Sequence, residues 1–388
     1  MVGRVDAVRN EFVIPDLESV REEASQIDAR AILDAPEEVR RHARAAAALA
    51  LWGDLSISTV QLKAAAEKRC STRRPALYTF SPVYTTNYCD SECRMCSMRK
   101  GNSRMDRKFA GRDLILNQLD VLYTHEGVRG VGLLTGEYGD KYTRLSSAFR
   151  VGWAARAALD MGFEQVYFNI GSVDREEIEV LGEWVSQEDP VMMCVFQETY
   201  HRETYRTFMG ATSESVPKAD FDRRAASFDA WLDAGFTHVN PGVLVGLHDD
   251  LSAELVNLVA HAEHLDGRGA TVNLSLPRMR PAKASRAASR VSDDDYLRLM
   301  SVLAFLDPDQ RLVLTAREPA EFQEQVIDLV GVFSPGSPDV GAYSARSQAR
   351  NSEDSSQFLV ADIRRPRDIL RRLGAEGKDI RHFADPTV

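Results

Sequence analysis

Residues 77–96 read LYTFSPVYTTNYCDSECRMC, in which the apolar and aromatic run Leu77–Tyr84 precedes three cysteines, Cys89, Cys93 and Cys96. The run is typical of a buried β-strand. The chain has five cysteines in 388 residues, too few for a disulfide framework, and three of them lie within eight residues of one another. Thiols clustered this tightly in a reducing compartment usually bind metal or carry out redox chemistry.

Seven further short apolar or β-branched runs follow along the chain, and segments of helical period separate them. The runs are Val128–Leu134, Gln165–Ile170, Val191–Phe196, Thr237–Val245, Thr271–Leu276, Arg311–Thr315 and Ile327–Ser334. The clearest helical segments are Leu145–Ala158, Phe221–Ala234, Leu251–Leu265 and Asp293–Phe305. Strands that alternate with helices predict a parallel sheet. Eight such repeats predict an α/β fold closed as a (β/α)8 TIM-type barrel, for which roughly 250 residues suffice.

The chain is longer than one barrel, and the surplus lies at both ends. We predict three parts, namely an N-terminal helical extension (1–76), the barrel (77–340) and a lid loop with a C-terminal α/β tail (341–388). Residues 335–356 are rich in Ser, Gly, Pro, Asp and Asn, and an irregular stretch of this length is often a lid or a binding loop. The tail is predicted to form a strand at Gln357–Asp362 and a helix at Arg367–Leu373.

Composition narrows the classes of partner. The chain has 48 Lys and Arg against 58 Asp and Glu, a formal net charge of −10, and no basic run stands out. Nucleic acid and anionic membrane are therefore poor candidates for partners. No apolar stretch reaches the roughly 18–20 residues of a membrane helix, and residues 1–15 lack the apolar region of a signal peptide. We expect a cytoplasmic protein.

The spacing C-x3-C-x2-C suits an iron–sulfur cubane. Three thiolates can hold three irons of a [4Fe–4S] cluster and leave the fourth iron without a protein ligand. That iron can chelate the amino and carboxylate groups of S-adenosylmethionine (SAM), as a catalytic metal keeps one coordination position open. Electron transfer into the sulfonium then yields a 5′-deoxyadenosyl radical. The alternatives are a structural zinc site, which favours paired C-x2-C units or added histidines, and a chance grouping.

Polar residues follow several predicted strands, at the end of the barrel where active sites lie. After the second strand, Gly136 allows close approach to the backbone, and Glu137 offers a carboxylate to an ammonium group. After the third strand, Asn169 and Ser172 are candidates for hydrogen bonds to the SAM ribose or carboxylate. Leu247 follows the glycine-containing fifth strand and is predicted to cover the adenine ring. The structural alternatives are a solvated Glu, a plain turn and a kinked strand.

Arg317 follows the seventh predicted strand, and Ser334 ends the eighth. A guanidinium presents a planar fork of donors that pairs with a carboxylate through two parallel hydrogen bonds. Arg317 is therefore the best candidate for holding a substrate carboxylate. The alternative is a structural ion pair with a neighbouring acidic residue.

The cysteine loop after the first barrel strand resembles the signature of the radical SAM superfamily, and Gly136-Glu137 resembles its motif for the SAM amino group. Met95 stands where the superfamily usually has an aromatic residue, which is a mild departure. Four further blocks resemble the aromatic amino acid lyase branch, which includes the tyrosine lyases of thiazole synthesis and of hydrogenase-cofactor assembly. These blocks are Gln197–Tyr200, Ser275–Pro281, Ala316–Glu318 and Gln357–Phe358.

Within that branch, Tyr84–Cys93, Met95–Asn102 and Phe333–Val340 most resemble the tryptophan lyases, the 3-methyl-2-indolic acid synthases of nosiheptide-type thiopeptide biosynthesis. The similarity runs over nearly the whole chain. It implies that a hydrogen is taken from the amino nitrogen of L-tryptophan, that the side chain fragments, and that the carboxylate carbon moves to the indole ring to give 3-methyl-2-indolic acid.

The resemblance also implies site residues and partners. The residues matching Arg317, Ser334 and Tyr84 hold the substrate carboxylate and amino group in that family. The cofactors would be a [4Fe–4S] cluster and SAM, and the electron donor would be of flavodoxin or ferredoxin type. Two alternatives stay open at this point, a tyrosine lyase that cleaves the Cα–Cβ bond to give dehydroglycine, and a metal or iron–sulfur module without catalysis.

Overall fold

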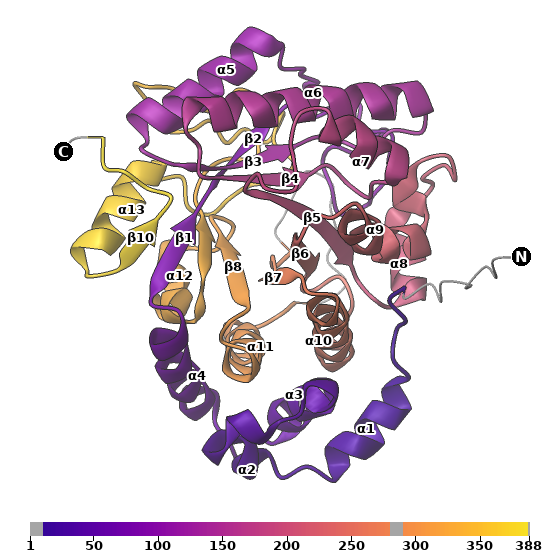
Figure 1. The fold of residues 1–388 in the computed structure, drawn as a ribbon, viewed down its shortest axis with the longest axis vertical. Helices are drawn as coiled ribbons and strands as arrows, with labels where there is room; N and C mark the ends of the chain where they lie inside the picture. Colours follow the sequence, from indigo (N-terminus) through magenta and orange to yellow (C-terminus); the bar gives the residue numbers. More distant parts are fainter. Residues whose placement is uncertain (1–10, 280–289, 387–388) are drawn as a thin grey trace, which may run out of the picture.

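The computed structural model describes residues 11–279 and 290–386 and is built around one parallel sheet of ten strands (Figure 1). The strands lie in the order β10-β1-β9-β8-β7-β6-β5-β4-β3-β2. Their bounds are β1 Ala76–Thr79, β2 Ser81–Tyr84, β3 Gly130–Leu134, β4 Gln165–Asn169, β5 Val191–Glu198, β6 His238–Val243, β7 Thr271–Ser275, β8 Arg311–Thr315, β9 Val332–Ser334 and β10 Asp379–Arg381. All eight predicted strand runs overlap strands of this sheet, and the predicted (β/α)8 TIM-type class is confirmed.

Strands β1 and β2 stand near opposite ends of this order, although only Phe80 separates them in the chain. β1 pairs with β9, whereas β2 pairs with β3. The sheet therefore curls round until its two ends meet in the segment 76–84. The single strand predicted at Leu77–Tyr84 is in fact two short strands, because each half pairs with a different neighbour.

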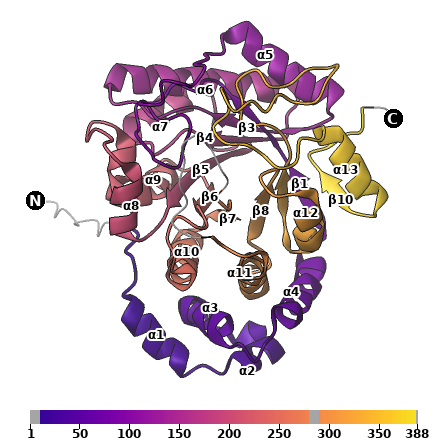
Figure 2. The same cartoon turned by 180° about the vertical axis from the view of Figure 1, so that it is seen from behind.

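Helices alternate with the strands and cover the outer face of the sheet (Figures 1 and 2). The α-helices are α1 Leu17–Ser25, α2 Ala29–Asp34, α3 Arg44–Gly53, α4 Thr59–Arg73, α5 Arg112–Asp120, α6 Lys141–Met161, α7 Arg175–Gly182, α8 Arg202–Met209, α9 Phe221–Asp233, α10 Leu251–Gly267, α11 Asp293–Leu306, α12 Ala320–Val326 and α13 Pro366–Ala375. Short 3-10 turns lie at Pro36–Glu38, Arg41–Ala43, Pro217–Ala219 and Ile327–Leu329, and a π-turn at Val121–His125 extends α5. Several of the barrel helices begin at an aspartate whose side chain accepts hydrogen bonds from the first turn, namely Asp140, Asp174, Asp220 and Asp250. None of the helices in 11–279 and 290–386 has the length and apolarity needed to cross a membrane.

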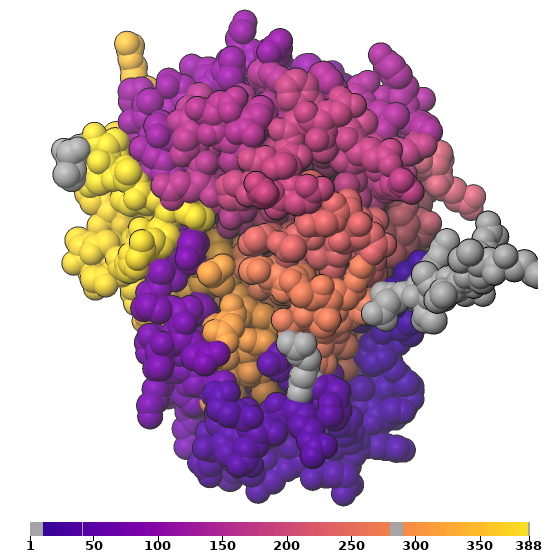
Figure 3. Space-filling model, viewed as in Figure 1, coloured from indigo at the N-terminus to yellow at the C-terminus, as the bar shows by residue number. Residues whose placement is uncertain are grey.

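The helices α1–α4 form a layer outside the barrel helices, where α3 packs against α10 and α4 against α11 (Figures 1 and 3). Arg298 of α11 holds this layer from within, because its buried guanidinium donates to carbonyl oxygens at and just beyond the end of α3. The acceptors, at 2.6–3.0 Å, are those of Leu51, Trp52, Asp54 and Ile57. Carbonyls at a helix C-terminus lack partners within the helix, so this arginine satisfies several of them at once.

The C-terminal tail differs from the prediction in one element. The strand predicted at Gln357–Asp362 is wrong, since this segment is irregular and its backbone bonds to loops: Ser97 N–H donates to Gln357 O, and Ala361 N–H to Ala316 O. The predicted helix at Arg367–Leu373 is confirmed as part of α13. The tail strand is β10, which pairs with β1.

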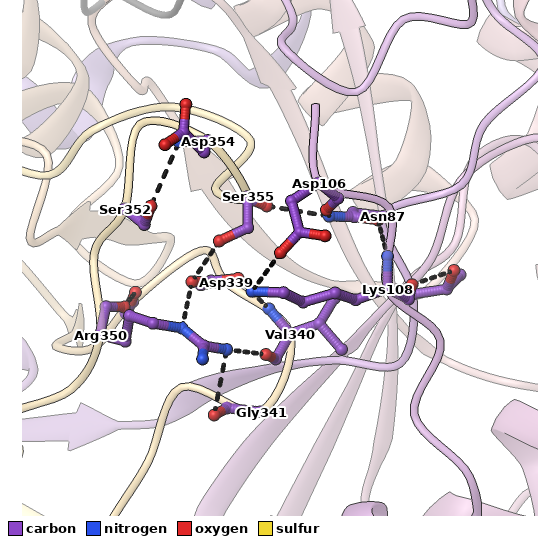
Figure 4. Close-up of polar contacts among 12 residues, drawn as sticks. Asn87, Asp106, Lys108, Asp339, Val340, Gly341, Arg350, Ser352, Asp354 and Ser355 are labelled. Atoms are coloured by element: carbon purple, nitrogen blue, oxygen red, sulfur yellow. Dashed lines mark hydrogen bonds and ion pairs between the residues drawn. The ribbon is translucent and has the colours of Figure 1, made fainter. Parts of the chain in front are cut away.

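Residues 335–358, here called the C-terminal loop, are fastened to the segment that carries the cysteines (Figure 4). The buried carboxylate of Asp339 accepts from Arg350 Nε at 2.7 Å and from Ser355 Oγ at 2.8 Å. Lys108 Nζ lies 3.8 Å from the same carboxylate. The amide of Asn87 donates to the Ser355 carbonyl at 3.0 Å. Residues that are far apart in the sequence thus form one wall above the barrel.

Candidate active site

A cavity opens at the C-terminal ends of the barrel strands. Residues of every strand from β2 to β9 line it, together with the loops that follow these strands. Its volume, open mouth included, is about 1530 Å³.

The three predicted cluster cysteines all line this cavity, and none of them is in a disulfide. The backbone N–H groups of Ser91 and Glu137 lie 3.5 and 3.4 Å from Cys89 Sγ. The side-chain amide of Gln357 lies 3.5 Å from Cys96 Sγ. N–H donors of this kind tune the reduction potential of iron–sulfur clusters. Three thiols that line one cavity, two of them with N–H donors near the sulfur, fit a cubane with one iron left open.

Burial raises the pKa of Cys89, Cys93 and Cys96, and Lys218 opposes this rise at Cys93. Such thiols give up their proton to a metal ion more readily than to water, because the metal replaces the charge that burial penalises. Across residues 11–279 and 290–386, no three His, Cys, Asp or Glu side chains converge as ligands of a single ion. A cubane instead gives each thiolate its own iron.

Gly136 is required by the close approach of the cysteine loop. A Cβ atom at this position would lie 2.0 Å from the carbonyl oxygen of Tyr88 and 2.8 Å from Cys89 Cα. Gly171, at φ 89°, plays a similar part for Glu137, whose carboxyl carbon would be 2.3 Å from an added Cβ. Glycine is the residue that permits both approaches.

Only one of the two carboxylate oxygens of Glu137 has a hydrogen-bond partner. Oε1 accepts from Arg224 Nη1 at 2.7 Å, whereas Oε2 is buried and has no hydrogen-bond partner within the protein. Buried polar atoms seldom lack a partner. An unpartnered carboxylate oxygen on the cavity wall can therefore accept a hydrogen bond from a bound ammonium group.

The other three predicted SAM ligands are distributed differently. Asn169 lines the main cavity, but Ser172 lines a smaller adjoining cavity that shares Gly136 and Glu137 with it. The hydroxyl of Ser172 is buried without a partner. Leu247 is fully buried against Cys93 and Met95 and does not line the cavity; Leu244 does.

Sequence reasoning missed a pair of buried cations that line the same cavity as the cysteines. Lys218, in the 3-10 turn Pro217–Ala219, forms an ion pair with Glu198, and Arg224 of α9 forms the one with Glu137. Glu198 ends β5 with φ 70°, a conformation that is rare for a residue with a side chain. Burial works against its ionisation, yet Lys218 and Arg224 lower its pKa. Arg224 was detectable, because it falls on the apolar face of α9 with Phe221 and Phe228; Lys218 had no local signal.

Arg317, Tyr84 and Ser334 all line the same cavity. The guanidinium carbon of Arg317 lies 3.3 Å from the centroid of the Phe358 ring. The hydroxyl of Tyr84 donates to Gln357 Oε1 at 2.6 Å. Burial lowers the pKa of Arg317, and Tyr84 and Glu198 oppose this effect.

Five charged residues line the cavity, and four of them form the two ion pairs above. The fifth is Arg317, whose guanidinium has no carboxylate or hydrogen-bond partner among the residues that the structure describes. Its neighbour Glu318 pairs with Arg278 instead. The structural ion pair considered from the sequence is thus not formed. The cavity has one uncompensated positive charge, which favours an anionic ligand.

Comparison with protein-family models and with the sequences of curated proteins finds no match. Solved structures do match. HydG, a maturase of the [FeFe]-hydrogenase, superposes with a TM-score of 0.79 and 25% identity over 95% of this chain and 80% of that one. HydG from Carboxydothermus hydrogenoformans gives 0.76 and 22% over 95% and 82%. Methylornithine synthase (PylB) gives 0.67 and 17% over 92% and 98%, a likeness of fold.

The curled parallel barrel, the three-cysteine loop at its mouth and the similarity to HydG at 25% identity define the class. The chain is a radical SAM enzyme, and its cofactors are a [4Fe–4S] cluster and SAM. An enzyme of this class takes electrons from a reductant and acts on a small molecule.

Proposed function

We propose that this enzyme is an L-tryptophan lyase that converts L-tryptophan to 3-methyl-2-indolic acid in thiopeptide antibiotic biosynthesis. The reaction comprises hydrogen abstraction from the amino group, fragmentation of the side chain and migration of the carboxyl carbon. The observation that carries the proposal is the unpaired guanidinium of Arg317, which shares one cavity with the three cysteines. The resemblance of the sequence to tryptophan lyases supports the choice of substrate.

Residues of the cavity described above would bind the two cofactors. Cys89, Cys93 and Cys96 would ligate three irons, and SAM at the fourth would supply a 5′-deoxyadenosyl radical on reduction. The free Oε2 of Glu137 would accept from the SAM ammonium group, with Arg224 holding the other carboxylate oxygen in place. Asn169 and Ser172 would face the ribose or the carboxylate of SAM, Leu247 would pack in the buried cluster with Cys93, and Leu244 would lie at the adenine side.

The substrate side would work by orientation. Arg317 would grip the carboxylate through two parallel donors, with the Ser334 hydroxyl beside it and Tyr84 at the amino group. The apolar floor of the cavity, with Phe80 and Phe196, offers contact to an aromatic ring. Fixing both ends of an amino acid in this way can contribute several kcal/mol of the ~7–11 kcal/mol available from orientation. It also limits the escape of a fragment.

Three further assignments belong to the proposal. The electron donor would be a flavodoxin- or ferredoxin-type protein, and the enzyme would work in the cytoplasm. The chain would divide functionally at residues 76 and 340 into extension, barrel and lid with tail.

Of the sequence blocks that suggested the family, Arg280 and Pro281 lie outside the described residues.

The alternative is a tyrosine lyase, which the likeness to a hydrogenase maturase favours. Anaerobic turnover of the reconstituted enzyme with SAM and a reductant, with L-tryptophan and L-tyrosine offered separately, distinguishes the two. We expect 3-methyl-2-indolic acid from L-tryptophan. Release of a cresol-type product from L-tyrosine, with no product from L-tryptophan, would establish the alternative.

A further inference from the structure

The side chain of Gln357 lies between a predicted cluster ligand and a predicted substrate ligand. Its Oε1 accepts from the Tyr84 hydroxyl at 2.6 Å, and its Nε2 lies 3.5 Å from Cys96 Sγ. Tyr84 ends β2, Cys96 lies in the cysteine loop, and Gln357 comes from the C-terminal loop. One amide therefore joins three segments at the point where the two halves of the cavity meet.

The orientation of this amide follows from the chemistry of its partners. A cysteine that ligates iron is a thiolate, which accepts hydrogen bonds and has none to donate. The NH2 group of Gln357 must then face Cys96, because the reverse orientation sets a carbonyl oxygen against a negatively charged sulfur. With Nε2 so placed, Oε1 faces Tyr84 and accepts a hydrogen bond from its hydroxyl. The lone pairs of the Tyr84 oxygen then remain available to accept a hydrogen bond from a molecule in the cavity.

The backbone of Gln357 is held on both sides, which keeps the amide in reach of its two partners. Its N–H donates to the Pro338 carbonyl, and its carbonyl accepts from Ser97 N–H, both at 3.1 Å. The neighbouring Ser355 is fixed by the buried carboxylate of Asp339 (Figure 4). The C-terminal loop thus positions Gln357 from its own folded network.

We propose that Gln357 is a positioning residue that fixes Tyr84 as a hydrogen-bond acceptor toward the substrate amino group while donating to the cluster ligand Cys96. The inference rests on the proposed function, because it assigns Tyr84 to the amino group of an amino acid. Acceptance by Tyr84 orients one N–H bond of the substrate and thereby sets the directions of the others. Donation to Cys96 stabilises the more negative, reduced state of the cluster.

Three variants separate the two contacts. Gln357→Leu removes both, Gln357→Glu in alkaline buffer keeps the acceptor for Tyr84 and removes the donor to Cys96, and Tyr84→Phe removes only the hydroxyl. Each is reconstituted anaerobically, and iron content is measured first. The readouts are the cluster reduction potential, followed by electron paramagnetic resonance without substrate, and the ratio of product to 5′-deoxyadenosine.

We expect both Gln357 variants to have a more negative reduction potential than the wild type, because a donor to sulfur is lost. Tyr84→Phe should keep the wild-type potential. The product ratio should fall about tenfold in Gln357→Leu and Tyr84→Phe, as for the loss of one hydrogen bond to a charged group, and should fall less in Gln357→Glu. If Gln357→Leu takes up no iron, the isosteric Gln357→Glu carries the test of the potential.

Wild-type reduction potentials in both Gln357 variants would contradict the hydrogen bond from Gln357 to the cluster ligand Cys96. A product ratio in Gln357→Leu equal to that of the wild type would contradict the claim that Gln357 positions Tyr84. The reduction potential is measured without an amino acid, so this test of the contact between Gln357 and Cys96 remains valid even if L-tryptophan is not the substrate. Failure of the proposed function would instead appear as absence of product from the wild type.

Discussion

Arg317 and Phe358 form a cation–π contact, with the guanidinium carbon 3.3 Å from the ring centroid. Arg317 follows β8, whereas Phe358 ends the C-terminal loop, next to Gln357. Such a contact is worth about 0.5–1 kcal/mol at exposed sites and ~2 kcal/mol when desolvated. It holds the guanidinium by its face and leaves the N–H donors at its edge for a ligand. The C-terminal loop therefore supports both predicted substrate ligands, Arg317 directly and Tyr84 through Gln357.

Replacement of Arg317 should separate SAM cleavage from product formation. In Arg317→Ala we expect the cluster and uncoupled formation of 5′-deoxyadenosine to persist, while product formation falls about tenfold or more, because charged hydrogen bonds to the carboxylate are lost. Arg317→Lys keeps the charge without the planar fork and should recover only part of the loss. Product and 5′-deoxyadenosine are quantified by mass spectrometry. An unchanged product yield in Arg317→Ala would remove this residue from the site.

Loss of any one predicted cluster ligand should abolish SAM cleavage. Cys96→Ala leaves two thiolates, which cannot hold three irons of the cubane, and we expect little iron and no 5′-deoxyadenosine. Cys70 is the matched control, since it is buried in α4 and does not line the cavity. Cys70→Ser should keep the iron content of the wild type. A Cys96→Ala protein with full iron content and SAM cleavage would contradict the cluster assignment.

The approach of the cysteine loop to Gly136 makes a second test of the cluster site. In Gly136→Ala the new Cβ would lie 2.0 Å from the Tyr88 carbonyl oxygen, so the loop must shift. We expect reduced iron uptake and loss of SAM cleavage. Gly374→Ala, in α13, is the control: no atom lies within 4 Å of an added Cβ. It should preserve the cluster and add about 0.5–1 kcal/mol to the free energy of unfolding. Equal iron content in the two variants would refute the role of Gly136.

Glu254 gives the unfolding free energy a defined pH dependence. Burial raises its pKa from 4.5 to about 7, although Thr199 and the N–H of Tyr200 oppose the rise. Between these values the folded protein keeps a proton that the unfolded chain has released, so stability falls as pH rises from about 4.5 to about 7 and is constant above. Glu254→Gln should lack this contribution. Denaturant unfolding of both proteins across this range measures it, and parallel stability curves would contradict it.

Much of the fold was predictable because the strands are buried on both faces and read as continuous apolar runs. The residues predicted at the strand ends share one edge, which is why Glu137, Asn169, Arg317 and Ser334 line the cavity of the cysteines. Parallel strands bring their ends together whatever the distance between them in the sequence.

The features of the site that could not be predicted depend on contacts between residues far apart in the sequence, which leave no pattern in the local sequence. Gln357 reaches its partners across more than 250 residues of chain, 273 to Tyr84 and 261 to Cys96, and its segment imitates a strand by composition alone. Leu247 follows Gly246, where φ is 98°, and lies in a buried cluster with Cys93 and Met95, whereas Leu244 lines the cavity.

The substrate and the bond changes can be tested together by giving the reconstituted enzyme L-tryptophan that carries an isotope label in its carboxylate carbon. We predict that mass spectrometry will find the label in the carboxyl group of 3-methyl-2-indolic acid, and that a label at the α-carbon will be absent from this product. Formation of unlabelled 3-methylindole, with the carboxylate label in a two-carbon fragment, would contradict the proposed reaction. The enzyme would then cleave the Cα–Cβ bond of its substrate, as tyrosine lyases do.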